Sequence, residues 1–285
     1  MDYSVEVTVT GFAADAQLIA PAGLPSPYGC PVGVTVDGGA ARVVSEQASG
    51  QSALGVAPEA DAVTFRYRFI DAPGRYPEAM FRPTPSRFTR ATDALRAEAL
   101  DLAGTGDPLT RARHIACGVA ERFTYGHPEV RFTDGKDEVP ALGCGLTEGS
   151  CVDINTYFIA ALRASGIEAG YATGYFFPSE KRDWCSDGHC WVVTRIGGAT
   201  QEWDIAHHLK LGSRNVHPAL NPKPGFRVAL AHSMGLTFPA VGLVDLKALI
   251  EPMAVTGGRA HHLVGNRIRL THPTLVASAK WQAAR

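Results

Sequence analysis

Two stretches of the N-terminal third alternate strictly between apolar and polar residues, and this alternation limits what the chain can fold into. The apolar members of the two stretches are Tyr3, Val5, Val7 and Val9, and Val63, Phe65, Tyr67 and Phe69. A period of two places every second side chain on one face of a β-strand, so each stretch predicts a half-buried antiparallel strand. The turn signal Asp37-Gly38-Gly39 separates two further candidate strands, at 32–36 and 41–44. Residues 1–70 therefore predict a small β-sandwich.

A proline-rich segment follows the predicted strands, at 71–88. Its prolines are Pro73, Pro77, Pro83 and Pro85. Because proline interrupts helices and removes a hydrogen-bond donor from a central strand, we expect an ordered linker here.

Helical spacing of apolar residues replaces the alternation after the linker. Helices are expected at 91–103 and from Pro108, where Asp107 supplies a capping carboxylate. A third helix is expected to begin at Cys151 and to end at Gly166. The β segments expected after it are 168–177, 189–196 and 201–206. Helices followed by strands are typical of an α+β domain in which helices cover one side of an antiparallel sheet.

The composition argues against two classes of partner. Lys and Arg total 27 against 28 Asp and Glu, for a formal net charge of -1, so we expect no nucleic-acid partner. No apolar run reaches the ~18–20 residues that span a bilayer, so we expect no membrane partner. The start of the chain lacks the basic and apolar regions of a signal peptide, which predicts a cytoplasmic protein. The six cysteines are too scattered for a disulfide framework, as expected in that compartment.

Three residues stand where nucleophilic catalysis would need them. Cys151 begins a predicted helix, and the free N–H groups and dipole of a helix N-terminus favour a thiolate. His189 begins one predicted strand, and Asp204 lies in the next. A thiol, an imidazole and a carboxylate that orients the imidazole are the standard parts of an activated cysteine nucleophile.

The hairpin between the last two strands allows a test by counting. If Gly197-Gly198 is a two-residue turn, paired residues have numbers that sum to 395, as the two glycines do. His189 and Asp204 then become diagonal neighbours on one face, about 7–8 Å apart at the backbone. A three-residue loop without a bulge would place them on opposite faces.

Each of these residues also has a purely structural interpretation. A cysteine at a helix start is more often a packing residue, a histidine on a strand is usually structural, and Asp204 could be a surface carboxylate. Asp187 is a rival for the orienting carboxylate, and His207 and His208 are rivals for the base. The residues alone leave these alternatives open.

A longer series of motifs resembles the core of the bacterial transglutaminase-like superfamily. The segments that carry the resemblance are Gly149-Ser150-Cys151, Leu162-Arg163-Ala164-Ser165-Gly166-Ile167, Gly174-Tyr175, His189-Cys190-Trp191 and Trp203-Asp204. The family runs through the same motifs in the same order and at similar intervals. Its members often carry an N-terminal β domain like that predicted for residues 1–70. The resemblance is strong for 108–206, fair for 1–107 and weak beyond 212.

The resemblance implies a papain-like α+β core at 86–212, preceded by a β-sandwich domain with its linker at 1–85. A C-terminal extension at 213–285 is expected to pack on the core. Cys151 would be the nucleophile, His189 the general base and acid, and Asp204 the orienting carboxylate. Ser150 stands where tissue transglutaminases have glutamine, and Ile205 stands where the family commonly has proline. These departures leave the substrate open.

The expected function is therefore cysteine-dependent acyl transfer from an amide through a thioester. Hydrolysis, deamidation and transamidation share this first step, and the substrate would be a peptide, a protein or a small-molecule amide. No cofactor and no metal are expected, and the oligomeric state is left open.

Two alternatives compete with this expectation. An arylamine N-acetyltransferase-like enzyme has a similar triad, but the arginine normally upstream of its cysteine is missing between Gly145 and Gly149. A structural zinc site could draw its ligands from Cys144, Cys151, Cys185, His189 and Cys190. Their spacing does not form two Cys-x-x-Cys knuckles, which speaks against zinc.

Overall fold

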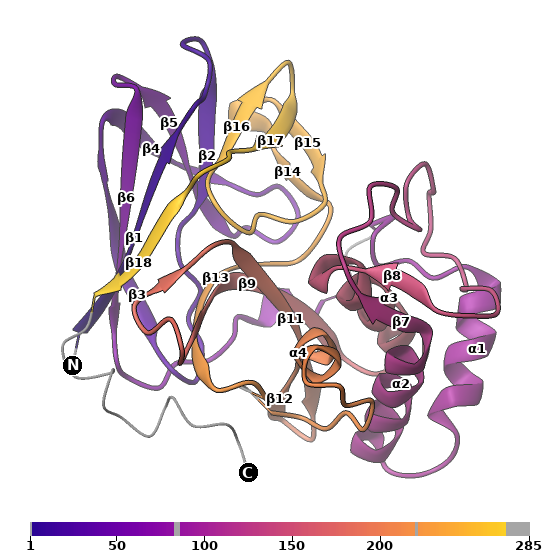
Figure 1. Ribbon diagram of the computed structural model, residues 1–285. Helices are drawn as coiled ribbons and strands as arrows, with labels where there is room; N and C mark the ends of the chain where they lie inside the picture. Colours follow the sequence, from indigo (N-terminus) through magenta and orange to yellow (C-terminus); the bar gives the residue numbers. More distant parts are fainter. Residues whose placement is uncertain (1, 83–85, 220–221, 272–285) are drawn as a thin grey trace. The chain divides into compact units, whose positions relative to one another are not determined.

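The computed structural model describes residues 2–82, 86–219 and 222–271 (Figure 1). Its sheets are mostly antiparallel and its helices are few, with several strands before the first long helix. The predicted α+β class with a preceding β-rich region is confirmed. Pro83 and Pro85 of the predicted linker, and the end of the predicted C-terminal extension, lie outside the described residues.

The chain groups into two compact units. Among the described residues, unit 1 takes those up to Ala79, the segment Thr173–His189 and the segment 224–271. Unit 2 takes Met80–Ala172 and Cys190–Lys223. The linear division into 1–85, 86–212 and 213–285 stays a prediction. The two units interleave along the sequence.

Unit 1 is built on two five-stranded sheets, with strand orders β10-β18-β1-β6-β3 and β17-β16-β2-β5-β4. The strands of the first sheet are β1 Asp2–Thr10, β3 Cys30–Asp37, β6 Ala62–Ile70, β10 Trp184–Cys185 and β18 Arg267–Thr271. Those of the second sheet are β2 Gln17–Pro21, β4 Gly39–Ser45, β5 Ser52–Pro58, β16 Met253–Thr256 and β17 Arg259–His262. Smaller elements are β14 Leu236–Phe238, β15 Leu243–Leu246 and the short 3₁₀ turns η1 Glu78–Met80, at the boundary of the two units, and η2 Pro239–Val241.

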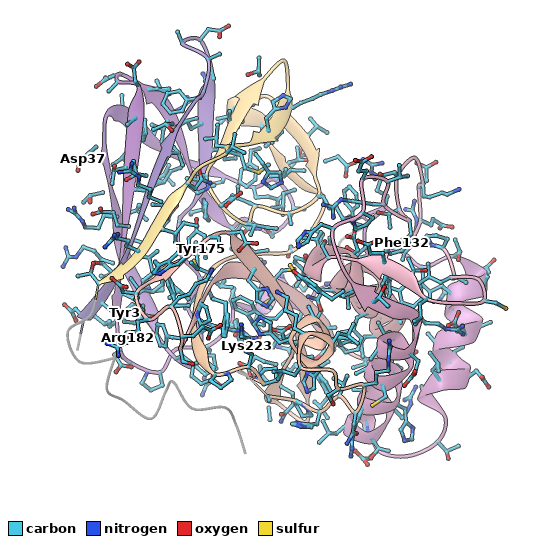
Figure 2. All side chains as sticks on the ribbon, in the orientation of Figure 1. Tyr3, Asp37, Phe132, Tyr175, Arg182 and Lys223 are labelled. Carbon is cyan, nitrogen blue, oxygen red and sulfur yellow. The ribbon has the colours of Figure 1, made fainter. Side chains whose placement is uncertain are left out.

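The alternation read from the sequence becomes the core of unit 1. Val5, Val7 and Val9 of β1 are fully buried, while the residues between them are only half-buried. They join one apolar cluster with Leu18 of β2, so the cluster takes side chains from both sheets. Burial of one face of each sheet against the other is what defines a β-sandwich. Tyr3, labelled in Figure 2, stacks on Phe69 across the first sheet with ring centroids 5.0 Å apart.

The turn predicted at Asp37-Gly38-Gly39 does not close a hairpin. β3 pairs with β6 whereas β4 pairs with β5, so the chain crosses from one sheet to the other at this turn. Gly38 has a φ of +86°, and a Cβ there would lie 2.2 Å from the main-chain oxygen of Ala62. Only glycine fits that position.

The C-terminal strands complete the two sheets of unit 1. β18 pairs with β1 in antiparallel register, and β16 pairs with β2. Figure 1 shows the yellow strand β18 alongside the indigo strand β1. Residues separated by more than 250 positions therefore share one sheet.

Unit 2 carries the helices. They are α1 Asp93–Ala103, α2 Pro108–Arg122, α3 Cys151–Ala164 and α4 Ile205–Lys210, and the short strands β7 Phe123–Tyr125 and β8 Thr147–Gly149 pair in parallel. Asp107 caps α2 as predicted, since its Oδ1 accepts the N–H groups of Leu109 and Thr110 at 2.9 and 3.1 Å. None of the helices among the described residues is long and apolar enough to cross a membrane.

A four-stranded sheet has the order β12-β11-β9-β13. Its strands are β9 Ala169–Pro178, β11 Gly188–Ile196, β12 Ala199–Trp203 and β13 Gly225–His232. Strands β9 and β11 each begin in one unit and end in the other. The β11–β12 pairing runs from Ile196↔Ala199 to Val192↔Trp203, which is the register predicted by the sum of 395.

The turn of this hairpin is Gly197-Gly198, whose φ values are +58° and +81°. Two positive φ angles are typical of a type I′ turn, which glycine adopts without strain. The predicted strand 201–206 is wrong after Trp203, because Asp204 ends the strand by capping helix α4.

Candidate functional site

The start of helix α3 is fixed by a buried carboxylate. Oδ2 of Asp153 accepts hydrogen bonds from the backbone N–H and the hydroxyl of Ser150, at 3.0 and 2.7 Å. Arg131 donates to both oxygens of the same carboxylate, each at 3.0 Å. Asp153 is fully buried, and a buried carboxylate is stable only when it is paired and hydrogen-bonded. This cluster fixes the backbone between Ser150 and Asp153. That stretch includes Cys151, the first residue of the helix.

Cys151 and its neighbour Cys190 are both buried residues of unit 2. Cys151 is 8% exposed, and Cys190 of β11 is fully buried. Burial, followed by a hydrogen bond with Cys151, raises the pKa of the Cys190 thiol well above its ordinary value. The direction of that shift means that Cys190 stays a protonated thiol.

Asn155 and Tyr171 complete this environment, and sequence reasoning missed both. Asn155 lies one helical turn after Cys151, and its amide donates to the main-chain oxygen and the sulfur of Cys190, at 3.0 and 3.5 Å. Burial raises the pKa of the Tyr171 hydroxyl, so the ring stays neutral. The i, i+4 spacing of Cys151 and Asn155 was the available sequence signal for a shared helix face.

Asp204 is the N-cap of α4 rather than a strand residue. Its Oδ1 accepts the backbone N–H of His207 at 3.0 Å, and its Oδ2 lies 3.0 Å from Nδ1 of the His207 ring. The next histidine, His208, contacts a different part of the same residue, since its Nδ1 lies 2.8 Å from the Asp204 main-chain oxygen. The carboxylate is fully buried, and both histidines are nearly so.

His189 is the second residue of β11 and is 5% exposed. Its ring centroid lies 6.1 Å from that of Phe176. One ring nitrogen of His189, one carboxylate oxygen of Asp204 and one ring nitrogen of His207 all lie within 4.8 Å of one another. The rival carboxylate Asp187 is exposed.

A metal ion would find a single group of three candidate ligands within the described part of the chain, namely His189, Asp204 and His207. Two imidazoles and a carboxylate are a donor set that zinc accepts. None of the cysteines proposed as zinc ligands belongs to that group. All six cysteines are free thiols.

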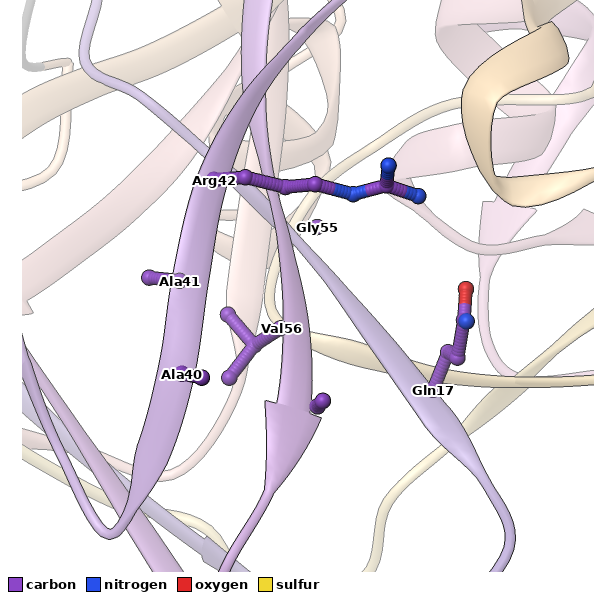
Figure 3. Close-up of a pocket in the computed structure, with 7 residues that line it drawn as sticks. Gln17, Ala40, Ala41, Arg42, Gly55 and Val56 are labelled. Carbon is purple, nitrogen blue, oxygen red and sulfur yellow. The ribbon is translucent and has the colours of Figure 1, made fainter.

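A separate hollow on unit 1, drawn in Figure 3, carries no comparable chemistry. It has a volume of about 320 Å³ and is lined by Gln17, Ala40, Ala41, Arg42, Gly55, Val56 and Ala57. Arg42 is its only ionisable lining residue, and its guanidinium donates to the main-chain oxygen of Ala240 at 2.6 Å. The hollow therefore offers neither a nucleophile nor a base.

Comparisons with known proteins agree with the motif-based interpretation. The family model described as the transglutaminase-like superfamily matches residues 96–204, a segment that contains Cys151 and His189 and ends on Asp204. None of the curated proteins matches this chain.

Two solved structures are similar to this chain at low sequence identity. A candidate cysteine protease from Cytophaga hutchinsonii is 14% identical, with a TM-score of 0.55, over 95% of this chain and 90% of that one. The periplasmic domain of TgpA from Pseudomonas aeruginosa is 12% identical, with a TM-score of 0.36, over 74% of this chain and 90% of that one. The first similarity supports the fold, and the second is too weak to carry an argument. The motifs and the matched segment agree, so residues 96–204 are similar to the core of the transglutaminase-like superfamily.

Proposed function

We propose that the protein is a cysteine-dependent acyl-transfer enzyme that acts on an amide. The observation that supports this most strongly is the position of Cys151. It is the first residue of α3, inside the segment that matches the transglutaminase-like superfamily. A helix N-terminus favours a thiolate and supplies N–H donors near any oxyanion that forms at the adjacent carbonyl.

The reaction would proceed in two balanced halves. The Cys151 thiolate attacks the amide carbonyl, and His189 protonates the departing nitrogen, so that ammonia or an amine leaves and a thioester forms. Water or a second amine then attacks the thioester while His189 takes its proton, which releases the acid or the new amide and restores the thiolate. Asp204 would hold the imidazole of His189 in the productive tautomer.

The substrate class under this proposal is a peptide, a protein or a small-molecule amide. Hydrolysis, deamidation and transamidation differ only in the leaving group and in the acceptor of the acyl group. The arylamine N-acetyltransferase-like alternative receives no support from the comparisons, which match the transglutaminase-like superfamily instead. A cytoplasmic location is part of the proposal, and six free thiols support it because reduced cysteines are the rule there.

The experiment is to trap the acyl-enzyme. The protein is incubated with a library of glutamine-containing and amide-capped peptides, and the reaction is quenched in acid. The intact mass of the protein is then measured by mass spectrometry. The proposal predicts an adduct with the mass of the acyl fragment, mapped to Cys151 and absent from Cys151→Ala. The matched control is Cys117→Ala, which removes a thiol from α2 and should form the adduct normally. An adduct that persists in Cys151→Ala would refute the proposal.

A metal assay separates the proposal from zinc chemistry. Stoichiometric zinc in the purified protein, bound through His189, Asp204 and His207, would contradict the thiol mechanism. The thiol mechanism predicts the same adduct yield with and without a chelator.

A further inference from the structure

His207, a residue of the helix that Asp204 caps, contacts the carboxylate of Asp204. Both of its oxygens are engaged by His207, one by the backbone N–H at 3.0 Å and one by the ring Nδ1 at 3.0 Å. The first contact is the ordinary N-cap hydrogen bond of a helix. The second is not required by capping, because one oxygen is enough to cap.

The ring contact sets how the carboxylate is oriented. A carboxylate with one hydrogen bond can rotate about its Cβ–Cγ bond, whereas a carboxylate held through both oxygens cannot. An ionised carboxylate only accepts hydrogen bonds, so the Nδ1 of His207 must carry the hydrogen of this contact. Asp204 is fully buried and His207 is 2% exposed, so water does not compete for either partner.

From this geometry we infer that His207 is a positioning residue, which fixes the carboxylate of Asp204 in the orientation that a catalytic imidazole needs. The inference rests on the proposed function, in which Asp204 orients His189. His207 does not touch the substrate or exchange a proton in this account. The sequence offers His207 only as a rival base, whereas its contact with Asp204 gives it a positioning role.

The neighbouring histidine provides a matched control. His208 lies on the same short helix, is equally buried, and contacts Asp204 through the main-chain oxygen rather than the carboxylate. Loss of the His208 ring contact therefore perturbs the helix to a similar extent without releasing the carboxylate. If the role of His207 is purely structural, substitutions that remove the ring contact of His207 or of His208 should slow Cys151 alkylation equally.

Amide side chains of two lengths test which atom matters. Asparagine can place its amide nitrogen where Nδ1 of histidine lies, whereas the nitrogen of glutamine reaches the position of Nε2. His207→Asn therefore keeps a donor for the Asp204 carboxylate, and His207→Gln loses it while remaining polar and of similar size. Because both substitutions preserve a polar side chain, the comparison survives even if His207→Ala fails to fold.

The readout is the rate constant for alkylation of Cys151 by iodoacetamide at pH 6, in a Cys144→Ser background that removes the exposed thiol. Circular dichroism checks that each variant is folded. We expect His207→Gln to react about 100-fold more slowly than the parent, the scale of loss that follows a misplaced catalytic group. His207→Asn and the control His208→Gln should stay within about threefold of the parent on the same reasoning.

Two outcomes would overturn the inference, and they are separable from failure of the proposed function. Equal rates for His207→Gln and His207→Asn, or an equal loss in His208→Gln, would assign His207 to the fold alone. Asp204→Asn is measured alongside them. If that variant reacts like the parent, the proposed role of Asp204 fails. If it slows while His207→Gln does not, only the positioning role of His207 fails.

Discussion

Replacement of Asp153 by asparagine tests whether the buried carboxylate at the start of α3 holds the candidate nucleophile in place. The substitution keeps the size of the side chain but turns one acceptor oxygen into a donor. In the parent protein the carboxylate accepts hydrogen bonds from Ser150 and from Arg131, whose donor atom lies 3.0 Å from each oxygen. In the variant the new amide nitrogen must face one of these donors.

The expected cost follows from these contacts. A hydrogen bond to a charged group contributes roughly 1.5–3 kcal/mol. Arg131 keeps 38% of its side-chain surface exposed, so solvent screens part of its attraction to the carboxylate. We therefore expect Asp153→Asn to lower the free energy of unfolding by about 2 kcal/mol. Urea titrations followed by tryptophan fluorescence measure this value.

The matched control is Asp107→Asn at the start of α2. Asp107 also caps its helix, but it is exposed, and asparagine caps a helix about as well as aspartate. Its unfolding midpoint should therefore stay close to that of the parent. Asp153→Asn should also slow alkylation of Cys151, whereas Asp107→Asn should not. Equal stability losses in the two variants would show that the buried carboxylate has no special role.

Three further outcomes are expected. Burial lowers the pKa of His232 to about 4 in the folded protein. In the unfolded chain the histidine has its ordinary pKa of about 6.5, so the unfolded chain binds the proton first as the pH falls. The stability that the neutral His232 contributes should therefore be fully present above pH 6.5. The free energy of unfolding should drop by up to about 3 kcal/mol between pH 6.5 and 4. His232→Gln should flatten that slope in urea titrations. A Cβ on Gly174 would overlap the main-chain oxygen of Val228, so Gly174→Ala should lower the free energy of unfolding by about 3 kcal/mol or more. Gly143 has open space around it, so Gly143→Ala should unfold like the parent in the same urea titration. Cys151→Ala should lose all turnover in a peptide-amide assay while its melting temperature stays within a few degrees of the parent, and retained turnover would rule out the thiol as nucleophile.

Elements with a strong local signal could be predicted from the sequence. The alternation in β1 and β6 and the cap at Asp107 each follow from a few neighbouring residues. The register of the β11–β12 hairpin followed from the Gly197-Gly198 turn alone, because a two-residue turn fixes every pair above it.

Features that depend on distant segments could not be predicted. The pairing of β18 with β1 joins the two ends of the described chain, and short apolar runs near the C-terminus do not reveal their partner. β3 and β4 lie in different sheets because β3 pairs with β6 and β4 pairs with β5, and no local signal in the sequence specifies these partners. Local chemistry can hide as well, since Asp204 follows a strand pattern and yet caps a helix.

The candidate site was predicted as three residues, and its surroundings were not. The roles of Cys151, His189 and Asp204 stay predictions until activity is measured. Asn155 joins the surroundings of Cys151 through Cys190, a contact that only the packing of α3 on β11 creates. His207 was visible in the sequence as a histidine near the aspartate, but its orientation depends on the α4 turn.

The most direct test of the central claim is the pH dependence of Cys151 alkylation. The rate is measured from pH 5 to 9 with limiting iodoacetamide, in the Cys144→Ser background and in the same background with His189→Ala. An ordinary thiol reacts appreciably only near its ionisation, at a pH of about 8.5. We expect Cys151 of the parent to react rapidly already near pH 6, and we expect His189→Ala to remove this reactivity. Identical profiles in the two proteins, both rising only near pH 8.5, would contradict it.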